Sequence, residues 1–296
     1  MLQVNNLTVT QNRDQRTLIS DLSFSLLKGD KLAVIGAEGN GKTALLRIIC
    51  EPELASAYLS WQGHIDYAPY HIGYLAQETP PHLYDKTVEV LTRPYISDGD
   101  LYRFADELML REDILFSRRT IESLSGGERM KLRFLLVRLK RPDIFVLDEP
   151  INDLDLEGIQ LVEAFISDCP KPVLFVSHDE TLLDRTANKI LHIEQIWRRT
   201  EARATYSSLG FSEYMTKFVY DIERQNRIAA KEEKVFRNKM RRHLEIQDKV
   251  HRAQENISRR DPSGARLLKK KMHSVKSTGR RLERERNEGT KRTDRE

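Results

Sequence analysis

The chain has 296 residues, a formal net charge of +4 and two cysteines. Its apolar runs are strand-sized, well short of the ~20 residues that a membrane-spanning helix needs, and two isolated cysteines cannot form a disulfide framework. The first residues lack the charged and apolar regions of a signal peptide, so we expect a soluble, cytoplasmic protein with no membrane insertion.

The first predicted elements are three strands, over residues 2–10, 22–27 and 31–35. A glycine-rich loop follows the third strand directly, and its residues are Gly36, Ala37, Glu38, Gly39, Asn40, Gly41, Lys42 and Thr43. Residues 44–49 then read as a helix. The loop therefore has the strand, loop and helix context that a phosphate-binding loop requires.

Each part of this loop has a physical use in binding a nucleoside triphosphate. The glycines let backbone N–H groups turn toward the phosphates, and the helix N-terminus adds partial positive charge. Lys42 would reach the β- and γ-phosphate oxygens, and the Thr43 hydroxyl would ligate Mg²⁺. The alternative is a fortuitous glycine-rich turn, because the pattern alone arises by chance in roughly one chain in a hundred of this length.

Strands and helices alternate through the rest of the front part. Short strands are predicted over 57–61 and 72–76, and helical spacing then takes over, with apolar positions that recur between residues 88 and 108. The later elements are a helix over 126–140, a strand over 144–147, a helix over 156–166 and a strand over 173–176. This order favours an α/β fold with a mainly parallel sheet wrapped by helices.

From about residue 212 the chain predicts one charged helix of some 45 residues, a break at 259–265 and a second helix that ends near Glu288. The second helix would run back along the first, with Gly279 as its weak point. The apolar residues that could face one another are Leu267, Leu268, Met272 and Val275, with Met240, Leu244, Ile246 and Val250. The alternative is a partly disordered polar tail.

The charge is divided unevenly. Residues 221–296 hold 24 Lys or Arg against 13 Asp or Glu, a net charge of +11, whereas residues 1–220 hold 25 against 32, a net charge of −7. A basic tail on an acidic front indicates a polyanionic partner, with nucleic acid as the leading candidate. The alternative is a solvated helix with i to i+4 ion pairs.

Five further motifs follow the phosphate-binding loop. They are Gln77 at the end of a strand run, Leu124-Ser125-Gly126-Gly127-Glu128 before a helix, Asp148-Glu149 at the end of a strand, Asn152-Asp153-Leu154-Asp155, and Ser177-His178-Asp179. In this order they resemble the nucleotide-binding domain of the ATP-binding cassette (ABC) superfamily. The resemblance implies an ABC ATP-binding domain over residues 1–205, with a small helical subdomain at about 80–140.

The carboxylates suit ATP hydrolysis. Asp148 could hold Mg²⁺ through water, and Glu149 could polarise the attacking water. By the resemblance, His178 would contact the γ-phosphate, Gln77 would sense Mg²⁺ and the water, and Asp155 would belong to the nucleotide-binding set. Taken singly, Asp148 would read as a strand-end turn and His178 as a core histidine.

Ser125, Gly126 and Gly127 form a second anion site at a helix N-terminus. In the family this site completes the ATP pocket of an opposite cassette, so the resemblance implies an ATPase that needs a second cassette.

Family members usually stack adenine on an aromatic residue of the early strands, but residues 1–23 contain none. Arg13 or Arg16 could stack instead, which leaves the choice between ATP and GTP open.

The helical tail resembles the linker of the F subfamily, in which two cassettes are joined and work on the ribosome. The expected function is an ATPase in translation, with antibiotic ribosomal protection as one form. The tip at 259–266 and the clusters at 259–260 and 269–271 would contact RNA. The chain would then be a first cassette with its linker at 212–296, either a fragment, a truncated form or one half of a homodimer. A transporter subunit and an ATP-dependent RNA-binding module with little hydrolysis remain as alternatives.

Overall fold

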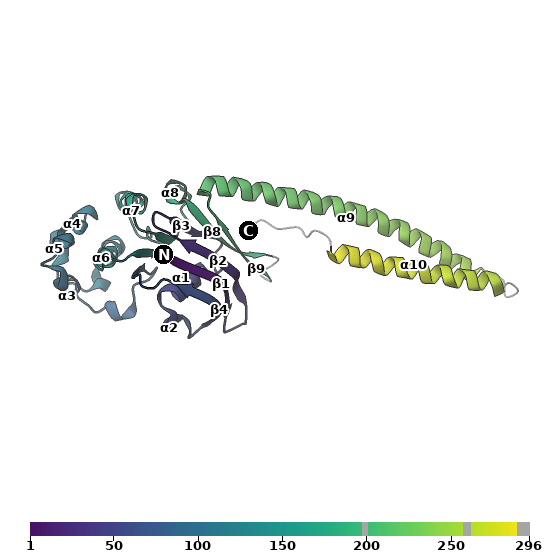
Figure 1. Ribbon diagram of the computed structural model, residues 1–296, viewed down its shortest axis with the longest axis horizontal. Helices are drawn as coiled ribbons and strands as arrows, with labels where there is room; N and C mark the ends of the chain where they lie inside the picture. The colour runs from purple at the N-terminus through teal and green to yellow at the C-terminus, as the bar shows by residue number, and fades with distance from the viewer. Residues whose placement is uncertain (197–200, 257–261, 289–296) are drawn as a thin grey trace. The chain divides into compact units, whose positions relative to one another are not determined.

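The computed structural model describes residues 1–196, 201–256 and 262–288 (Figure 1). It has two compact units, Met1–Met215 and the residues from Thr216 onward, and the long helix α9 (Phe211–Glu255) continues from one into the other. Within the described residues, no helix is both long and apolar enough to cross a bilayer. The expected α/β class and the two-helix hairpin are confirmed.

The central sheet of the first unit has six strands. Their order is β5 (Ile72–Leu75), β6 (Ile144–Asp148), β7 (Val173–Val176), β3 (Lys31–Ile35), β8 (Lys189–Ile196) and β9 (Glu201–Ser207). The first five strands are parallel, and β9 pairs antiparallel with β8. Every residue of β3, β6 and β7 is buried, as expected for parallel strands covered on both faces.

A smaller antiparallel sheet consists of β2 (Thr17–Leu26), β1 (Leu2–Gln11) and β4 (Leu59–Asp66). Its apolar side chains share one core with α1 (Lys42–Cys50) and the central sheet. The strand predicted over 22–27 in fact begins at Thr17. Its first residues were missed because Asp21, with a φ of 48°, interrupts the alternation of buried residues. The strand predicted over 57–61 instead lies further toward the C-terminus, as β4.

Helices cover the central sheet, and short ones form the region between β5 and β6. The region between β5 and β6 holds α3 (Val88–Thr92), α4 (Gly99–Glu107), α5 (Glu112–Leu115) and α6 (Gly126–Leu139), with 3₁₀ turns at Pro81–Leu83, Arg93–Tyr95 and Ile121–Ser123. Elsewhere, α2 (Pro52–Ala55) precedes β4, α7 (Leu156–Asp168) follows β6 and α8 (Glu180–Thr186) follows β7. Figure 1 shows α3, α4 and α5 grouped beside α6. The sequence patterns did not predict α8, β8 or β9.

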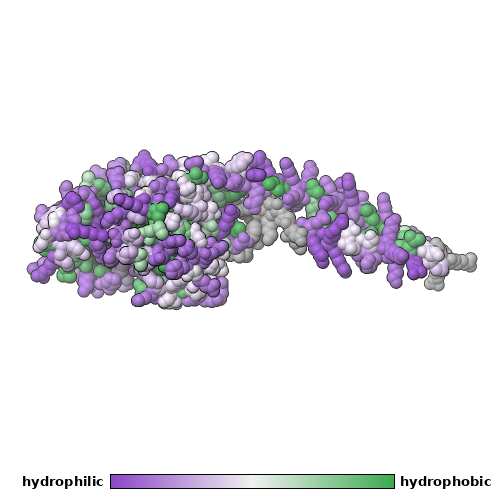
Figure 2. Space-filling view, in the orientation of Figure 1, coloured by the Kyte–Doolittle hydropathy of each residue, from purple (hydrophilic) through white to green (hydrophobic). Residues whose placement is uncertain are grey.

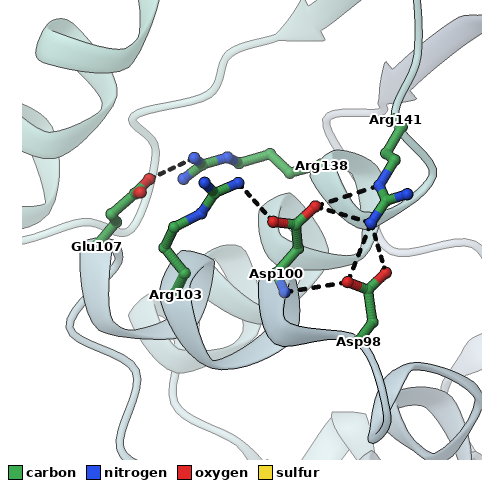
Figure 3. A network of polar contacts seen from close by, with 6 residues as sticks. All are labelled: Asp98, Asp100, Arg103, Glu107, Arg138 and Arg141. Atoms are coloured by element: carbon green, nitrogen blue, oxygen red, sulfur yellow. Dashed lines mark hydrogen bonds and ion pairs between the residues drawn. The ribbon is translucent and has the colours of Figure 1, made fainter.

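Ion pairs attach α4 to α6 and to the residues just after it (Figure 3). Arg141 reaches Asp98 and Asp100, each at 2.9 Å, and Asp98 also caps α4 by accepting a hydrogen bond from the Asp100 backbone. Arg138 of α6 pairs with Glu107 and lies over the ring of Phe104 at 4.0 Å. The side chains at the two ends of α4 therefore tie it to α6 and to the loop that follows α6.

In the second unit, α9 and α10 (Pro262–Glu288) are antiparallel. Three contacts set their register: Lys239 pairs with Glu285 at 2.9 Å, the Arg286 guanidinium lies 5.4 Å from the Phe236 ring centre, and Gly279 faces His243. The residues that are wholly or partly buried recur at intervals of three and four: Phe236, Met240, His243, Gln247 and Val250, with Leu268, Met272, Val275, Gly279 and Leu282. This is coiled-coil spacing.

The predicted contacts of the hairpin were partly wrong. Val250 and Val275 are buried, whereas Leu244, Ile246 and Leu267 are exposed. Each exposed residue is one position away from a partly buried one, so its side chain is turned about 100° away from that neighbour around the helix axis. Figure 2 shows the hairpin as largely hydrophilic with isolated apolar spots. The predicted break at 259–265 is described only in part. Residues 259–261, which include the predicted RNA contacts Arg259 and Arg260, lie outside the described residues. Residues 262–265 form the first turn of α10.

Candidate nucleotide site

A cavity of about 790 Å³ opens beside the phosphate-binding loop. It brings together predicted residues from four segments of the chain, namely Glu38, Gly39, Gly41, Lys42, Thr43, Gln77, Asp148, Glu149 and His178. The segments meet because β3, β5, β6 and β7 are parallel and their carboxyl ends lie at one edge of the sheet. Ligands of open α/β sheets bind at this edge.

Positive φ angles and hydrogen bonds fix the backbone of the phosphate-binding loop. Gly39 and Gly41 have φ angles of 76° and 101°, which favour glycine, and Gly41 is the residue that precedes α1. The Lys42 ammonium donates to the carbonyl oxygens of Gly36 at 2.7 Å and Ala37 at 3.0 Å. Asn40 donates its side-chain amide to the Ile193 carbonyl at 3.2 Å, which ties the loop to β8.

Asp148 ends β6 with its side chain fully buried in the sheet edge. The Thr43 hydroxyl donates to Asp148 Oδ1 at 3.4 Å, and burial raises the pKa of this carboxyl. Asp148 Oδ2 is buried and has no hydrogen-bond partner among the described residues. A hydroxyl beside a carboxylate with an unused oxygen suits a hard cation such as Mg²⁺, so the donors fit the metal that the sequence predicts.

Glu149 is turned away from Asp148, because its φ of 50° rotates the backbone at this position. Its Oε1 lies 3.5 Å from His178 Nε2. Burial and the neighbouring Asp148 raise the pKa of Glu149 to about 7, against the opposing effect of Lys42. Burial and Lys42 lower the pKa of His178. The two adjacent carboxylates thus have different surroundings, as different tasks would require.

Ser125, Gly126, Gly127 and Asp155 do not line this cavity. Ser125 Oγ accepts from the Glu128 backbone at 3.2 Å and Glu128 accepts from the Ser125 backbone at 3.0 Å, so the pair forms a capping box on α6. Asp155 caps α7 by accepting from the Gly158 backbone at 2.9 Å. Gly126 lines an adjacent cavity of about 480 Å³, which it shares with Gln77 and Asp153.

Sequence reasoning missed one aromatic residue of the nucleotide cavity. Tyr58 lies just before β4, beyond the early strands where an aromatic residue was sought, and it lines the same cavity as Arg16. Arg47 of α1 donates to the Tyr58 hydroxyl at 3.0 Å, and Arg16 donates to the Gly39 carbonyl at 3.2 Å. The pairing of β4 with β1 brings residue 58 beside Asn12, a signal that spans the sheet rather than one segment.

Comparison with known proteins identifies the class. Residues 19–152 match the family model described as ABC transporter. The fold matches that of the bacterial ABC transporter cassette MJ0796, in a dimeric structure, with a TM-score of 0.54 and 18% identity over 71% of this chain and 100% of that chain. Together with the sheet, the phosphate-binding loop and the signature motif, this match shows that the front of the chain carries an ATP-binding cassette domain.

Two curated relatives narrow the class. The chain is 34% identical over 198 residues to the ribosome protection protein VmlR of Bacillus subtilis, a match that covers 65% of this chain and 34% of VmlR. It is 32% identical over 180 residues to the ATP-binding protein Uup of Haemophilus influenzae, over 59% of this chain and 27% of Uup. Both relatives are F-type ABC proteins, so the resemblance found in the sequence is confirmed. The chain spans about a third of their length or less.

Proposed function

We propose that this chain is an ATP-hydrolysing cassette of the F type that acts on the ribosome in translation. The observation that carries the proposal is the convergence of Lys42, Thr43, Asp148, Glu149 and His178 on one cavity. Hydrolysis of ATP to ADP and phosphate needs phosphate binding, charge neutralisation and a positioned water, and this set supplies donors for each need.

In the proposed reaction, Lys42 moves from the loop carbonyls to the β- and γ-phosphates. Glu149 orients and polarises the water, whose oxygen bonds to the γ-phosphorus while the bond to the β,γ-bridging oxygen breaks. ADP leaves with that electron pair, and the proton of the water ends on the phosphate. His178 would hold the γ-phosphate and Gln77 the water. Mg²⁺, bound through Thr43 and Asp148, would neutralise charge on the phosphates.

The purine ring would lie against Tyr58. Among the residues that line the cavity, Tyr58 supplies the phenol ring, and its bond to Arg47 fixes where the ring points. Arg16 lines the same cavity and carries a planar guanidinium. Stacking is tolerant of base identity, so this pair favours purine binding without deciding between ATP and GTP.

A second cassette would complete the site. The helix that carries Ser125, Gly126 and Gly127 has its N-terminus outside this chain's own nucleotide cavity, which leaves that anion site for another nucleotide. The partner would be a cassette of another segment of the same protein or a second copy of the chain. Asp155 would support this face by holding the start of α7.

The basic hairpin supports ribosomal RNA as the partner. Lys269, Lys270 and Lys271 are exposed on α10, and the name of VmlR describes ribosome protection. Protection against an antibiotic is the narrower form of the proposal. Binding of RNA phosphates by exposed lysines would weaken steeply with salt.

Co-sedimentation with ribosomes tests the proposal. Glu149→Gln should slow hydrolysis and hold the ATP-bound state, so this variant should pellet with ribosomes when ATP is present. The double variant Lys42→Ala, Glu149→Gln is the matched control, since it should not retain ATP. If Glu149→Gln with ATP never pellets at physiological salt, the ribosomal assignment is wrong. Phosphate release by the unmutated chain separates an ATPase from an RNA-binding module with little hydrolysis.

A further inference from the structure

Arg133 makes an unusual set of contacts inside the cassette. It lies in the middle of α6, where it is only 7% exposed. Its Nη2 donates to the carbonyl oxygen of Ala76 and, at 2.9 Å, to that of Glu78, while Nη1 donates to the Gln77 carbonyl at 3.4 Å. One guanidinium therefore holds three consecutive carbonyls just after β5.

This arrangement is costly for a residue that only fills space. A buried guanidinium loses its hydration, and in the described residues its hydrogen-bond partners are neutral carbonyls rather than a carboxylate. An apolar side chain would pack at this position without that cost. The fork of Arg matches the curved run of carbonyls, which Lys cannot reproduce.

The loop that Arg133 holds is the one that carries Gln77. The Gln77 side chain belongs to the lining of the nucleotide cavity, and residues 76–80 form neither helix nor strand. Arg133 and Gln77 also line the adjacent cavity that contains Gly126. Arg133 thus connects the Gln77 loop to the helix whose N-terminus carries the Ser-Gly-Gly signature.

We propose that Arg133 is a positioning residue for Gln77. It fixes the backbone of residues 76–78 so that Gln77 faces the nucleotide and its Mg²⁺, and it makes the Gln77 loop move with α6. This inference rests on the proposed ATPase function. It adds that a nucleotide bound by the N-terminus of α6 is sensed at Gln77 of the same chain.

Arg138 offers a matched control further along α6. Its side chain is 11% exposed and points to Glu107 (Figure 3). It also lies over the rings of Phe104 and Phe165. It holds the helical region to α6, and its hydrogen bond and ring contacts in the described part of the chain are with Glu107, Phe104 and Phe165. Replacing either arginine should lower stability, whereas only Arg133 should affect Mg²⁺ and the water.

The test compares Arg133→Met, Arg133→Lys, Arg138→Met and Gln77→Ala in the full chain. Binding of a fluorescent ATP analogue is titrated with Mg²⁺, and kcat and KM for ATP are measured beside it. Arg133→Met should weaken the Mg²⁺ dependence of binding about as much as Gln77→Ala, and lower kcat at least tenfold with KM changed less than threefold. Arg138→Met should leave both within twofold. The double variant Arg133→Met, Gln77→Ala should be no worse than either single variant, since the two changes act on one loop.

The inference is overturned if Arg133→Met behaves like Arg138→Met, or if its effects multiply with those of Gln77→Ala. Should Arg133→Met fail to fold, Arg133→Lys decides in the same assay, because a single ammonium cannot reproduce the fork that spans three carbonyls and should give an intermediate loss. Absent hydrolysis and absent ribosome binding by the unmutated chain would refute the proposed function. The Mg²⁺ titration of analogue binding would still show whether Arg133 positions Gln77.

Discussion

Lys42 illustrates how the nucleotide site is prepared at the scale of single residues. Its ammonium is buried and rests on two loop carbonyls, at the place where phosphate oxygens would replace them. The motif in the sequence predicted this residue because the phosphate-binding loop is a local structure. Tyr58 and Arg133 could not be predicted in the same way, since their contacts depend on strand pairing and on helix packing across more than 40 residues.

Lys42→Ala should abolish useful ATP binding. The charge-assisted hydrogen bonds to the phosphates are lost, which corresponds to an affinity loss of roughly 100-fold. Equilibrium binding of a fluorescent ATP analogue measures it. Lys28→Ala, in an exposed turn, is the control for removal of a lysine. Unchanged affinity of Lys42→Ala would refute the phosphate-loop assignment.

Tyr58→Ala should weaken nucleotide binding about fivefold, because one stacked base contributes roughly 1 kcal/mol at the low end of the known range. Tyr58→Phe keeps the ring and loses the bond to Arg47, so it should retain most of the affinity. The same binding assay applies, with inorganic triphosphate as a competitor that has no base. If Tyr58→Ala weakens triphosphate as strongly as ATP, the residue does not contact the base.

At the scale of elements, side-chain contacts fasten the start of α9 to the cassette. Tyr214 Oη lies 3.0 Å from His192 Nδ1 on β8, and Ser212 donates to Asp184 on α8.

Continuous apolar runs predicted β3, β6 and β7 almost residue by residue. The elements β8 and β9 were missed because polar residues such as His192 and Gln195 are buried in β8, where tertiary partners compensate for them.

His192 should make stability depend on pH. Burial, aided by Arg203, lowers its pKa to about 4 in the fold, whereas an exposed histidine titrates near 6.5. The unfolded chain therefore binds the additional proton between these values, and the stabilising contribution is complete above pH 6.5 and lost as the pH falls toward 4. At pH 5 the free energy of unfolding should be lower by about 2 kcal/mol on this account.

Denaturant unfolding at pH 7 and pH 5 measures this dependence, and the difference between wild type and His192→Phe isolates the histidine. The variant should have a smaller loss of stability between the two pH values. Equal losses in both proteins would show that His192 does not titrate as its buried position requires.

The hairpin allows a paired test of its packing. Val275 is 7% exposed and Leu267, on the same helix, is 70% exposed. Val275→Asp should destabilise the hairpin by roughly 2 kcal/mol or more, because a buried apolar contact is replaced by a charge. Leu267→Asp should have almost no effect. Helical circular dichroism during thermal unfolding distinguishes them, and equal effects would contradict the register.

At the scale of the whole molecule, charge is divided between a cassette with net −7 over residues 1–220 and a tail with net +11 over 221–296. This division was visible in the sequence because it needs only a count.

Removing Lys269, Lys270 and Lys271 together, each changed to Gln, should reduce the slope of log affinity for ribosomes against log salt by about 2 to 3. Lys28, Lys86 and Lys140 changed to Gln form the control on the cassette. An unchanged slope in the first triple variant would exclude these lysines from the RNA contact.

The capping box on α6 bears on how two cassettes would come together. Glu128 accepts from the Ser125 backbone and lies 3.7 Å from Arg119, so a carboxylate of this chain lies at the helix N-terminus where the proposed second nucleotide would bind. An incoming phosphate would have to exchange with Glu128 rather than enter a vacant position. The displaced carboxylate would still have Arg119 beside it, and closure of the pair would begin as a swap of one negative group for another.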